Sequence, residues 1–377
     1  QETTTLSGVR LDEQLGTNPL STLASISVRG QDTNWKTPYM QHWSFDVQHQ
    51  LTKSTVIDVG YYGSKGTNLI GVVDINLLPP GFASTQQCAT GSSTTPTVVC
   101  KQADVPFTTA AQSLILDQIR PYRGYRAVNI VKPMFNSNYH SLQVFAQHRF
   151  SGDSQASLAY TWSKNLTDNQ TDRSTAPQNP YDIPSEYGRA QLDRRHVLTA
   201  NYIYELPFYR DQRGFVGKVL GGWQASGIAT YQSGLPFTAV FSGYDPAGLG
   251  FLGPSVSGAR PNQIGDPNSG APNTFDQWFN TGAFDGSRPL TGVAQVPGSA
   301  GRGTINGPSL TRVDFTLVKN IRFTETMRLQ LRGEAFNIFN KTNFTGFGTN
   351  PGVLGSYGII NGARDPRTMQ LGIKFLF

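Results

Sequence analysis

The chain ends on RDPRTMQLGIKFLF, Arg364–Phe377, and this stretch decides the expected fold. One face of it is apolar and is made by every second residue, namely Met369, Leu371, Ile373, Phe375 and Phe377. Successive side chains of a β-strand point to opposite faces of its sheet. The alternation therefore predicts a strand with one apolar face. By itself, such a strand fits the end of a soluble β-sandwich as well as the end of a membrane barrel.

The composition excludes a helical membrane protein. Apolar residues make up 37% of the chain and the mean hydropathy is −0.33. No apolar run approaches the ~18–20 residues that a membrane helix needs. The chain is nevertheless rich in glycine, with 40 residues, and in aromatic residues, at 11%. This combination is typical of a β-barrel with a wet lumen, because each strand gives half of its residues to water.

The net charge of +6 raises the question of a nucleic-acid partner. The basic residues are scattered singly, however, and Arg194-Arg195 is the one adjacent pair. Nucleic-acid binding proteins gather their basic residues in a tract or a stripe. We therefore expect no nucleic-acid partner.

Alternation with a period of two recurs along the chain and predicts about ten strands. The clearest segments are Gln155–Ser163, His196–Tyr204, Trp223–Tyr231, Arg312–Leu317 and Met327–Ala335. Further strands are expected near Leu20–Val28, Tyr39–Gln50, Thr55–Tyr62 and Tyr139–Arg149. The terminal stretch completes the set, and the fold class is all-β.

The connections between these strands alternate between long and short. The long ones are Gly63–Asn138, Asn165–Arg194, Gln232–Pro308 and Lys341–Pro366. The short or intermediate ones are Leu51–Ser54, Ser151–Asp153, Leu206–Gly222 and Asn320–Thr326. A soluble sandwich has no reason to place every long loop at one end, whereas an outer-membrane barrel has short periplasmic turns and long extracellular loops. The sequence thus predicts an antiparallel transmembrane β-barrel with Phe377 at the periplasmic rim.

The polar faces of the strands agree with a barrel. Arg328, Gln330, Arg332 and Glu334 share one face of one expected strand. Their burial in a dry core would be costly, so we expect them to face a wet lumen. A sandwich strand with this face in bulk solvent remains the alternative for this strand alone. Aromatic residues near the strand ends, such as Trp223 and Tyr231, predict an interfacial girdle.

The two cysteines, Cys88 and Cys100, lie in the expected loop Gly63–Asn138. A metal site would need more ligands nearby, and none of the five histidines is close in the sequence. We expect the loop outside the cell, where cysteines oxidise. The two cysteines are therefore predicted to form a disulfide, with two unpaired thiols as the alternative.

The sequence contains no complete catalytic motif. The stretch GRGTING, Gly301–Gly307, has the wrong glycine spacing for a dinucleotide turn. Nucleophile elbows, H-E-x-x-H and C-x-x-C motifs do not occur. The stretch LDRRH, Leu192–His196, joins acid, base and imidazole, and at a strand entry it predicts rim salt bridges rather than catalysis. We expect no enzyme activity, no metal and no cofactor.

The ordered set of segments resembles the C-terminal part of TonB-dependent outer-membrane receptors, in particular their Oar-like group from acidobacteria. The resemblance is carried by NWKTPYMQHWSFDVQHQL, VIDVGYYGSKGTNLI, NSNYHSLQVFAQHRFSG, LAYTWSKNLTD, LDRRHVLTANYIYELPF, LGGWQASGIATYQSGLPFT, GPSLTRVDFTLVKNIRFTE, RLQLRGEAFNIFNKTNF and MQLGIKFLF. These segments run in family order from about Asn34 to the end of the chain.

The resemblance implies that residues 1–377 are the C-terminal portion of one barrel domain, either a fragment of a receptor or a shortened relative with another use. Family members have barrels of 22 strands, and they begin with a regulatory-like domain and a plug that this chain does not contain. In such proteins the alternating last strand looks like the signal read by the outer-membrane assembly machinery. That role falls here on Met369, Leu371, Ile373, Phe375 and Phe377.

The resemblance also implies a function. It suggests a receptor in the outer membrane of a Gram-negative bacterium that takes up a scarce or large ligand, such as an oligosaccharide, a peptide or a metal chelate. Outer-membrane lipid and the assembly machinery would be its partners, and the TonB complex would act through the missing N-terminal part. A structural or adhesive surface protein without transport, and a passive porin, remain open as alternatives.

Overall fold

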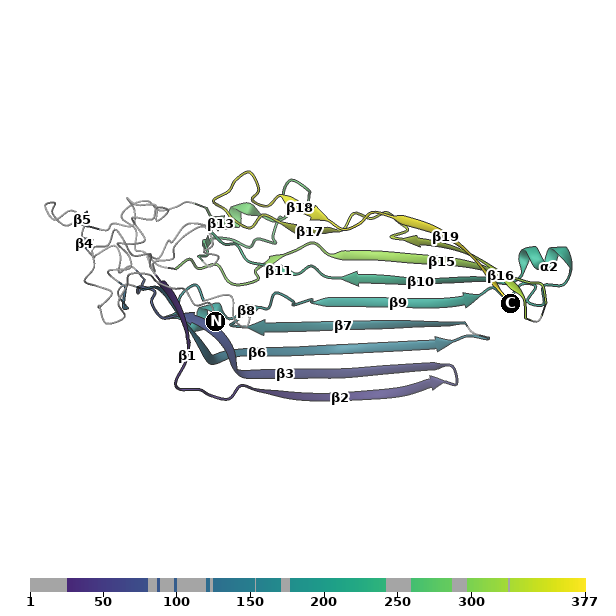
Figure 1. Ribbon diagram of the computed structural model, residues 1–377, viewed down its shortest axis with the longest axis horizontal. Coiled ribbons are helices and arrows are strands. Elements are labelled where there is room, and N and C mark those ends of the chain that lie inside the picture. The colour runs from purple at the N-terminus through teal and green to yellow at the C-terminus, as the bar shows by residue number, and fades with distance from the viewer. Residues whose placement is uncertain are drawn as a thin grey trace, which may run out of the picture.

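Nine long strands of the computed structural model follow one another through a single antiparallel sheet (Figure 1). The structure describes residues 26–80, 87–88, 98–99, 120–122, 125–152, 154–170, 177–241, 259–286, 297–324 and 326–377. In sheet order the strands are β2 (Tyr39–Thr52), β3 (Thr55–Asp74), β6 (Tyr125–Arg149), β7 (Gln155–Thr167), β9 (His196–Glu205), β10 (Trp223–Gln232), β15 (Leu310–Arg322), β16 (Arg328–Phe336) and β19 (Thr368–Leu376). The predicted antiparallel fold is confirmed. Within the described residues, β2 and β19 are the two edges, so the sheet is open.

The pairing keeps one register from β6 to β19. Every ladder between these strands runs without a bulge. Residues that lie opposite each other on paired strands share a face of the sheet, so the parity of each strand continues into the next. The ladders also pair the backbone N–H and C=O groups of the inner strands, as the interior of a membrane requires.

The connections place all long loops at one end of the sheet, which we call the long-loop end (Figure 1). The long connections comprise residues 75–124, 168–195, 233–309 and 337–367. The opposite, short-turn end holds residues 53–54, 150–154, 206–222 and 323–327, together with the C-terminus. The predicted alternation of long and short connections is confirmed. Among the described residues, no helix is long and apolar enough to cross a membrane.

Strands β3 and β6 reach further toward the long-loop end than the sequence predicts. The expected loop Gly63–Asn138 is wrong at both ends, because β3 continues to Asp74 and β6 begins at Tyr125. The two extensions pair with each other and bury apolar side chains such as Val72 and Phe135. Packing between the extensions, rather than alternation in either one, therefore holds these segments as strands.

The expected strand near Leu20–Val28 also needs correction. Residues 1–25 lie outside the described part, and β1 (Ile26–Gln31) pairs in parallel with the extension of β6. It is therefore an addition to the sheet and does not extend the antiparallel path. A second short addition, β8 (Gly188–Arg189), pairs with the end of β7.

The long connections contain short strands that the sequence analysis treats as loop. They are β4 (Gln87–Cys88), β5 (Val98–Val99), β11 (Pro236–Phe237), β12 (Asn262–Gln263), β13 (Phe284–Asp285), β14 (Ile305–Asn306), β17 (Phe344–Phe347) and β18 (Ile360–Ala363). They form pairs, and the pairs β11 with β14 and β12 with β13 fold the connection 233–309 back on itself.

One short helix, α2 (Gly214–Leu220), lies at the short-turn end between β9 and β10. It covers Lys319 of β15, which sits opposite Trp223 and Leu331 and so belongs to the apolar face. The Lys319 ammonium donates to three carbonyl oxygens at the helix C-terminus, those of Lys218, Val219 and Gly221. A helix leaves its last carbonyls without partners and carries negative partial charge there. The ammonium of Lys319 thus gains hydrogen-bond acceptors, and the carbonyls at the helix end gain a donor.

We expect Lys319→Met to lower the free energy of unfolding in detergent by about 2 kcal/mol, because three carbonyls lose a charged donor. The segment 206–222 should then become a site of protease cleavage. Lys374→Met is the matched control, since Lys374 is exposed and lies on the other face of the sheet. Surface changes of this kind usually shift stability by no more than ~0.5 kcal/mol. Equal effects of the two substitutions would show that Lys319 does not hold α2.

Candidate functional site: a polar sheet face and an outer loop assembly

The polar face of the sheet is continuous across its strands. Arg328, Gln330, Arg332 and Glu334 share one face of β16. Their partners opposite on β15 are Arg322, Asn320, Val318 and Thr316, and those on β19 are Leu376, Lys374, Gly372 and Gln370. On the strands further along the sheet, the same face carries Ser226, Asn201, Ser157 and Gln147. The assignment of this face to a lumen stays a prediction.

Side chains on the polar face bond to one another within and across strands. The Glu334 carboxylate accepts from both Gln370 and Arg332. Gln330 Nε2 donates to Asn320 Oδ1 at 3.0 Å, and Ser157 donates to Asn201 at 2.9 Å. These groups place polar donors and acceptors on several strands of the face. Such a face can present hydrogen bonds to a polar ligand.

The opposite face of the sheet is apolar, and its side chains are exposed or half-buried. It carries Val47, Ile57, Val144, Leu158, Leu198, Phe315, Leu329 and Ile373. Aromatic pairs mark its border toward the long loops. Tyr61 and Tyr160 bond to His140 and His196 at 2.7 and 2.8 Å, with stacked rings in both pairs. The border toward the short turns carries Tyr204 and Trp223. Aromatic residues thus stand at both borders of the apolar face, where the predicted girdle would lie.

The terminal strand β19 places Met369, Leu371, Ile373 and Phe375 on the apolar face, opposite Ala335, Gly333, Leu331 and Leu329. Phe377 follows the last paired residue, Leu376, and is 94% exposed. Its ring stacks on that of Phe375, with centroids 6.2 Å apart. Phe377 therefore makes little contact with the sheet. Its proposed role as an assembly signal stays a prediction.

An outer loop assembly stands at the long-loop end, and we define it as the described parts of residues 233–309 and 337–367. Its core consists of buried Ala239, Phe279, Ala283, Phe284, Ala300, Ile305, Phe347 and Ile360. Phe279 contacts the rings of Phe284, Phe347 and Tyr357. Because the core residues come from both connections, the two loops fold as one body. The alternation pattern of the sequence does not predict this folded loop assembly, although the cluster of aromatic residues in Phe275–Phe284 is a signal for its core.

A buried cluster of charges ties a third connection to this assembly. The Glu186 side chain is fully buried at the end of a 3₁₀ turn. Each of its carboxylate oxygens accepts from Arg260 Nη1 at 3.0 Å, and the carboxylate also accepts from Arg302. Gln178 completes the cluster, since its backbone N–H donates to Glu186 and its side chain accepts from the Arg260 backbone. Burial lowers the pKa of the Arg260 guanidinium from its ordinary value, and the Glu186 charge opposes that shift. Paired in this way, the buried charges link residues 177–195 to the assembly.

The stretch LDRRH makes the ion pairs that the sequence predicts. The buried Asp193 carboxylate accepts from Arg189 Nε at 2.8 Å, and Arg195 lies 4.0 Å away. The Asp193 carboxylate also accepts from the backbone N–H of Asn165 at 2.7 Å. His196 faces Tyr160 on the apolar side of the sheet and so does not join the acid. The stretch therefore fastens the entry of β9.

The predicted disulfide lies partly outside the described residues. Cys88 lies in β4, but Cys100 is outside the described residues, so the disulfide stays a prediction. Across the described ranges, no three His, Cys, Asp or Glu residues gather in a way that could hold a metal ion.

Comparison with known proteins shows the family. The model of the outer membrane beta-barrel domain family matches residues 2–370, and the chain belongs to this family. Membership places the chain in the outer membrane of a Gram-negative bacterium. In that setting we expect the apolar face to lie toward lipid. The long-loop end is then extracellular and the short-turn end periplasmic. A search of curated proteins found no significant match.

Three solved transporters align with most of this chain, each at a TM-score below 0.5. The transporter YddB from Escherichia coli aligns with 94% of this chain at 8% identity and a TM-score of 0.46. The FrpB iron transporter from Neisseria meningitidis aligns with 92% at 9% identity and a TM-score of 0.41. The copper transporter OprC aligns with 92% at 9% identity and a TM-score of 0.35. The chain spans about a third of each, covering 35%, 32% and 32% of their lengths.

We expect Glu186→Gln to release the third connection from the outer loop assembly. The substitution leaves two guanidinium groups near a neutral amide, and breaking a buried ion pair costs about 3–5 kcal/mol. Limited proteolysis of the protein in detergent should cut residues 177–195 much faster than in the wild type. Glu334→Gln, the same change in the exposed pair with Arg332, should have a far smaller effect on cleavage. Unchanged cleavage in Glu186→Gln would mean that the loops dock without the ion cluster.

If the last strand is an assembly signal, Phe377→Ala should lower the amount of protein in the outer membrane far more than its intrinsic stability. Phe377 is exposed, so its truncation should not cost the ~3–5 kcal/mol of a buried core aromatic. Leu331→Ala is the control, because Leu331 is lipid-facing in mid-strand and should assemble at nearly normal levels while unfolding more easily. The measurements are outer-membrane abundance and refolding in detergent. Equal abundance of the two variants would make Phe377 ordinary packing.

Proposed function

We propose that this chain is the C-terminal portion of the barrel of a TonB-dependent receptor of the Oar-like type, which takes up a scarce or large ligand. The ligand would be an oligosaccharide, a peptide or a metal chelate. Membership in the outer-membrane barrel family and the ordered resemblance of the segments support this proposal. The TonB complex would act through the N-terminal part of the receptor, and the assembly machinery would read β19.

The observation that carries the proposal is the folded outer loop assembly beside a continuous polar face. Binding sites are most precise when rigid elements hold their side chains. The assembly has its own hydrophobic core, and the Glu186 cluster fixes a further connection to it. Such loops can present a fixed surface to an arriving ligand, and the polar face offers further hydrogen bonds along the strands. Loops that merely bordered an open pore would need no buried ion cluster.

The proposal is tested in cells that lack the protein. We expect slower growth on at least one scarce oligosaccharide, peptide or metal chelate as the limiting nutrient, with the same defect in cells that lack TonB. Arg332→Ala should reduce uptake of the same nutrient several-fold at normal outer-membrane abundance, because Arg332 projects from the polar face. Uptake of the labelled nutrient is the measurement.

Two results would contradict uptake. Growth equal to that of the parent on every limiting nutrient, combined with loss of surface adhesion or cell–cell contact, would favour a structural or adhesive protein. A steady, non-selective conductance of the purified protein in planar bilayers, together with uptake that does not need TonB, would favour a passive porin.

A further inference from the structure

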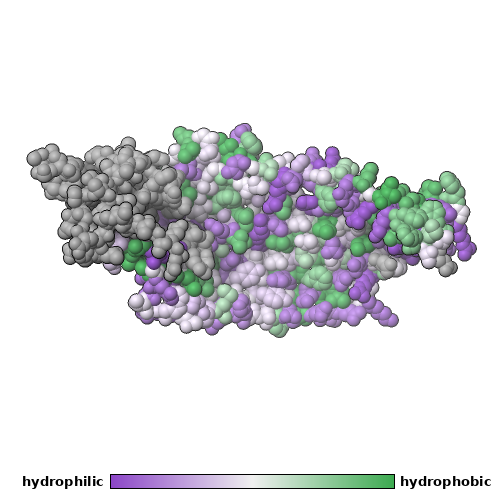
Figure 2. All heavy atoms as spheres, viewed as in Figure 1, coloured by the Kyte–Doolittle hydropathy of each residue, from purple (hydrophilic) through white to green (hydrophobic). Residues whose placement is uncertain are grey.

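The periplasmic segment 206–222 exposes large apolar side chains in and around α2. They are Phe208, Tyr209, Phe215, Val216, Val219 and Leu220, with Phe215 exposed to 83%. In the helix, a spacing of four residues joins Phe215 with Val219 and Val216 with Leu220. These four side chains therefore share one side of the helix. Figure 2 shows apolar side chains gathered at this end of the molecule, bordered by hydrophilic ones. This surface requires a cover that is itself apolar.

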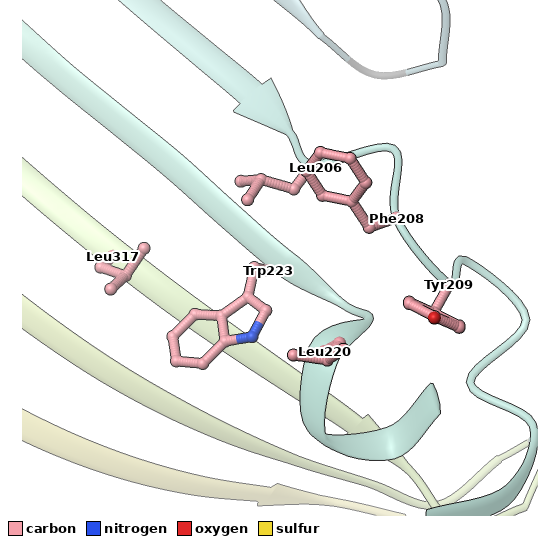
Figure 3. Close-up of a pocket in the computed structure, with 6 residues that line it drawn as sticks. All are labelled: Leu206, Phe208, Tyr209, Leu220, Trp223 and Leu317. Atoms are coloured by element: carbon pink, nitrogen blue, oxygen red, sulfur yellow. The ribbon is translucent and has the colours of Figure 1, made fainter. Parts of the chain in front are cut away.

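A groove lies between this segment and the sheet. It has a volume of about 530 Å³ and is lined by Leu206, Phe208, Tyr209, Leu220, Trp223 and Leu317 (Figure 3). Trp223 and Leu317 belong to the lipid-facing side of β10 and β15. The indole N–H of Trp223 donates to Val219 O at 3.1 Å, so the indole itself is not a free donor. The groove is therefore an apolar extension of the lipid-facing surface, in the size range of ligand pockets.

Hydrogen bonds and a close backbone approach fix the segment to β15 and so define the groove. Gln212 is buried; its side chain donates to Asn320 O at 2.9 Å and accepts from the Arg322 backbone at 3.0 Å. Gly222 has a φ of +71°, and a Cβ there would lie 2.3 Å from Asn320 O. Lys319 adds its bonds to the helix C-terminus. An occupant would thus lose little free energy to reorganisation of the protein.

The segment that forms one wall of the groove is basic in sequence. Segment 206–222 contains Arg210, Arg213 and Lys218 against the single acid Asp211. Lys218 also extends over the ring of Phe323, 5.8 Å from its centroid, on the adjacent turn. Basic residues beside Phe, Leu and Trp are the pattern of elements that lie in the membrane interface and attract anionic lipids. The charge thus complements a phosphate at the depth where lipid headgroups lie.

We infer that this groove binds one anionic phospholipid of the periplasmic leaflet. An acyl chain fills the space between Trp223, Leu317 and Leu220, and the phosphate meets the basic side chains of the segment. The occupant is a lipid rather than a protein, because the groove opens on the face of the sheet that lies against hydrocarbon. The inference rests on membership in the barrel family and does not depend on the proposed uptake function.

The probe is phosphatidylglycerol with brominated acyl chains, which quench tryptophan fluorescence at contact. It is titrated into the whole, delipidated protein in detergent. We expect saturable quenching that is absent from Trp223→Phe, and native mass spectrometry should show one retained phosphatidylglycerol. Leu220→Phe fills the groove, and the double substitution Arg213→Gln, Lys218→Gln removes charge from its rim. Each should weaken the saturable phase about tenfold.

The control is Leu371→Phe, the same substitution at an exposed, lipid-facing leucine outside the groove. It should leave the saturable phase unchanged, and heat-modifiable migration on gels should confirm that all variants are folded. Quenching that rises linearly with brominated lipid, equally in Leu220→Phe and Leu371→Phe, would overturn the site and show belt lipid only. Equal saturable quenching by brominated phosphatidylcholine would overturn the selection of an anionic lipid.

Discussion

The fold depends on one constraint, which is that a strand in hydrocarbon must pair every backbone N–H and C=O group with a neighbouring strand. The ladders from β6 to β19 meet it without a single shift of register. A shift by one residue would carry a strand's apolar set to the polar face. The unbroken register therefore does two things at once. It satisfies the backbone, and it separates a lipid-facing surface from a surface that can hold water and ligand.

The constraint is weaker at both ends of the sheet, where side-chain packing, ion pairs and helix carbonyls stabilise the chain. At the extracellular end, water can satisfy the backbone, so the loops are irregular and are held by a side-chain core and by the Glu186 cluster. At the periplasmic end, a lysine on the lipid-facing side would be costly if bare. Helix α2 covers it with carbonyl groups that themselves need a donor. The same helix then exposes apolar residues toward the interface.

The sequence predicts the sheet well because parity is a local property that neighbouring strands share. Leu329 and Leu331 alternate with Gln330 and Arg332 within a few residues, and no distant contact is needed to see it. The extensions of β3 and β6 were missed because Phe135 is buried by its pairing and packing across the sheet. The outer loop assembly was missed for a similar reason. Its core joins Phe279, Ile305 and Phe347 from separate segments that show no common period.

The direction of the edge strands bears on how the barrel closes. β2 runs from the long-loop end to the short turn at residues 53–54, and β19 runs the same way to the C-terminus (Figure 1). Joining these two edges directly would create a parallel pair, because nine strands of an up-and-down sheet are an odd number. Bacterial barrels have even numbers of antiparallel strands. An open edge in lipid is not tolerated either. The nine antiparallel strands of the described residues therefore need an odd number of further strands to close into a barrel.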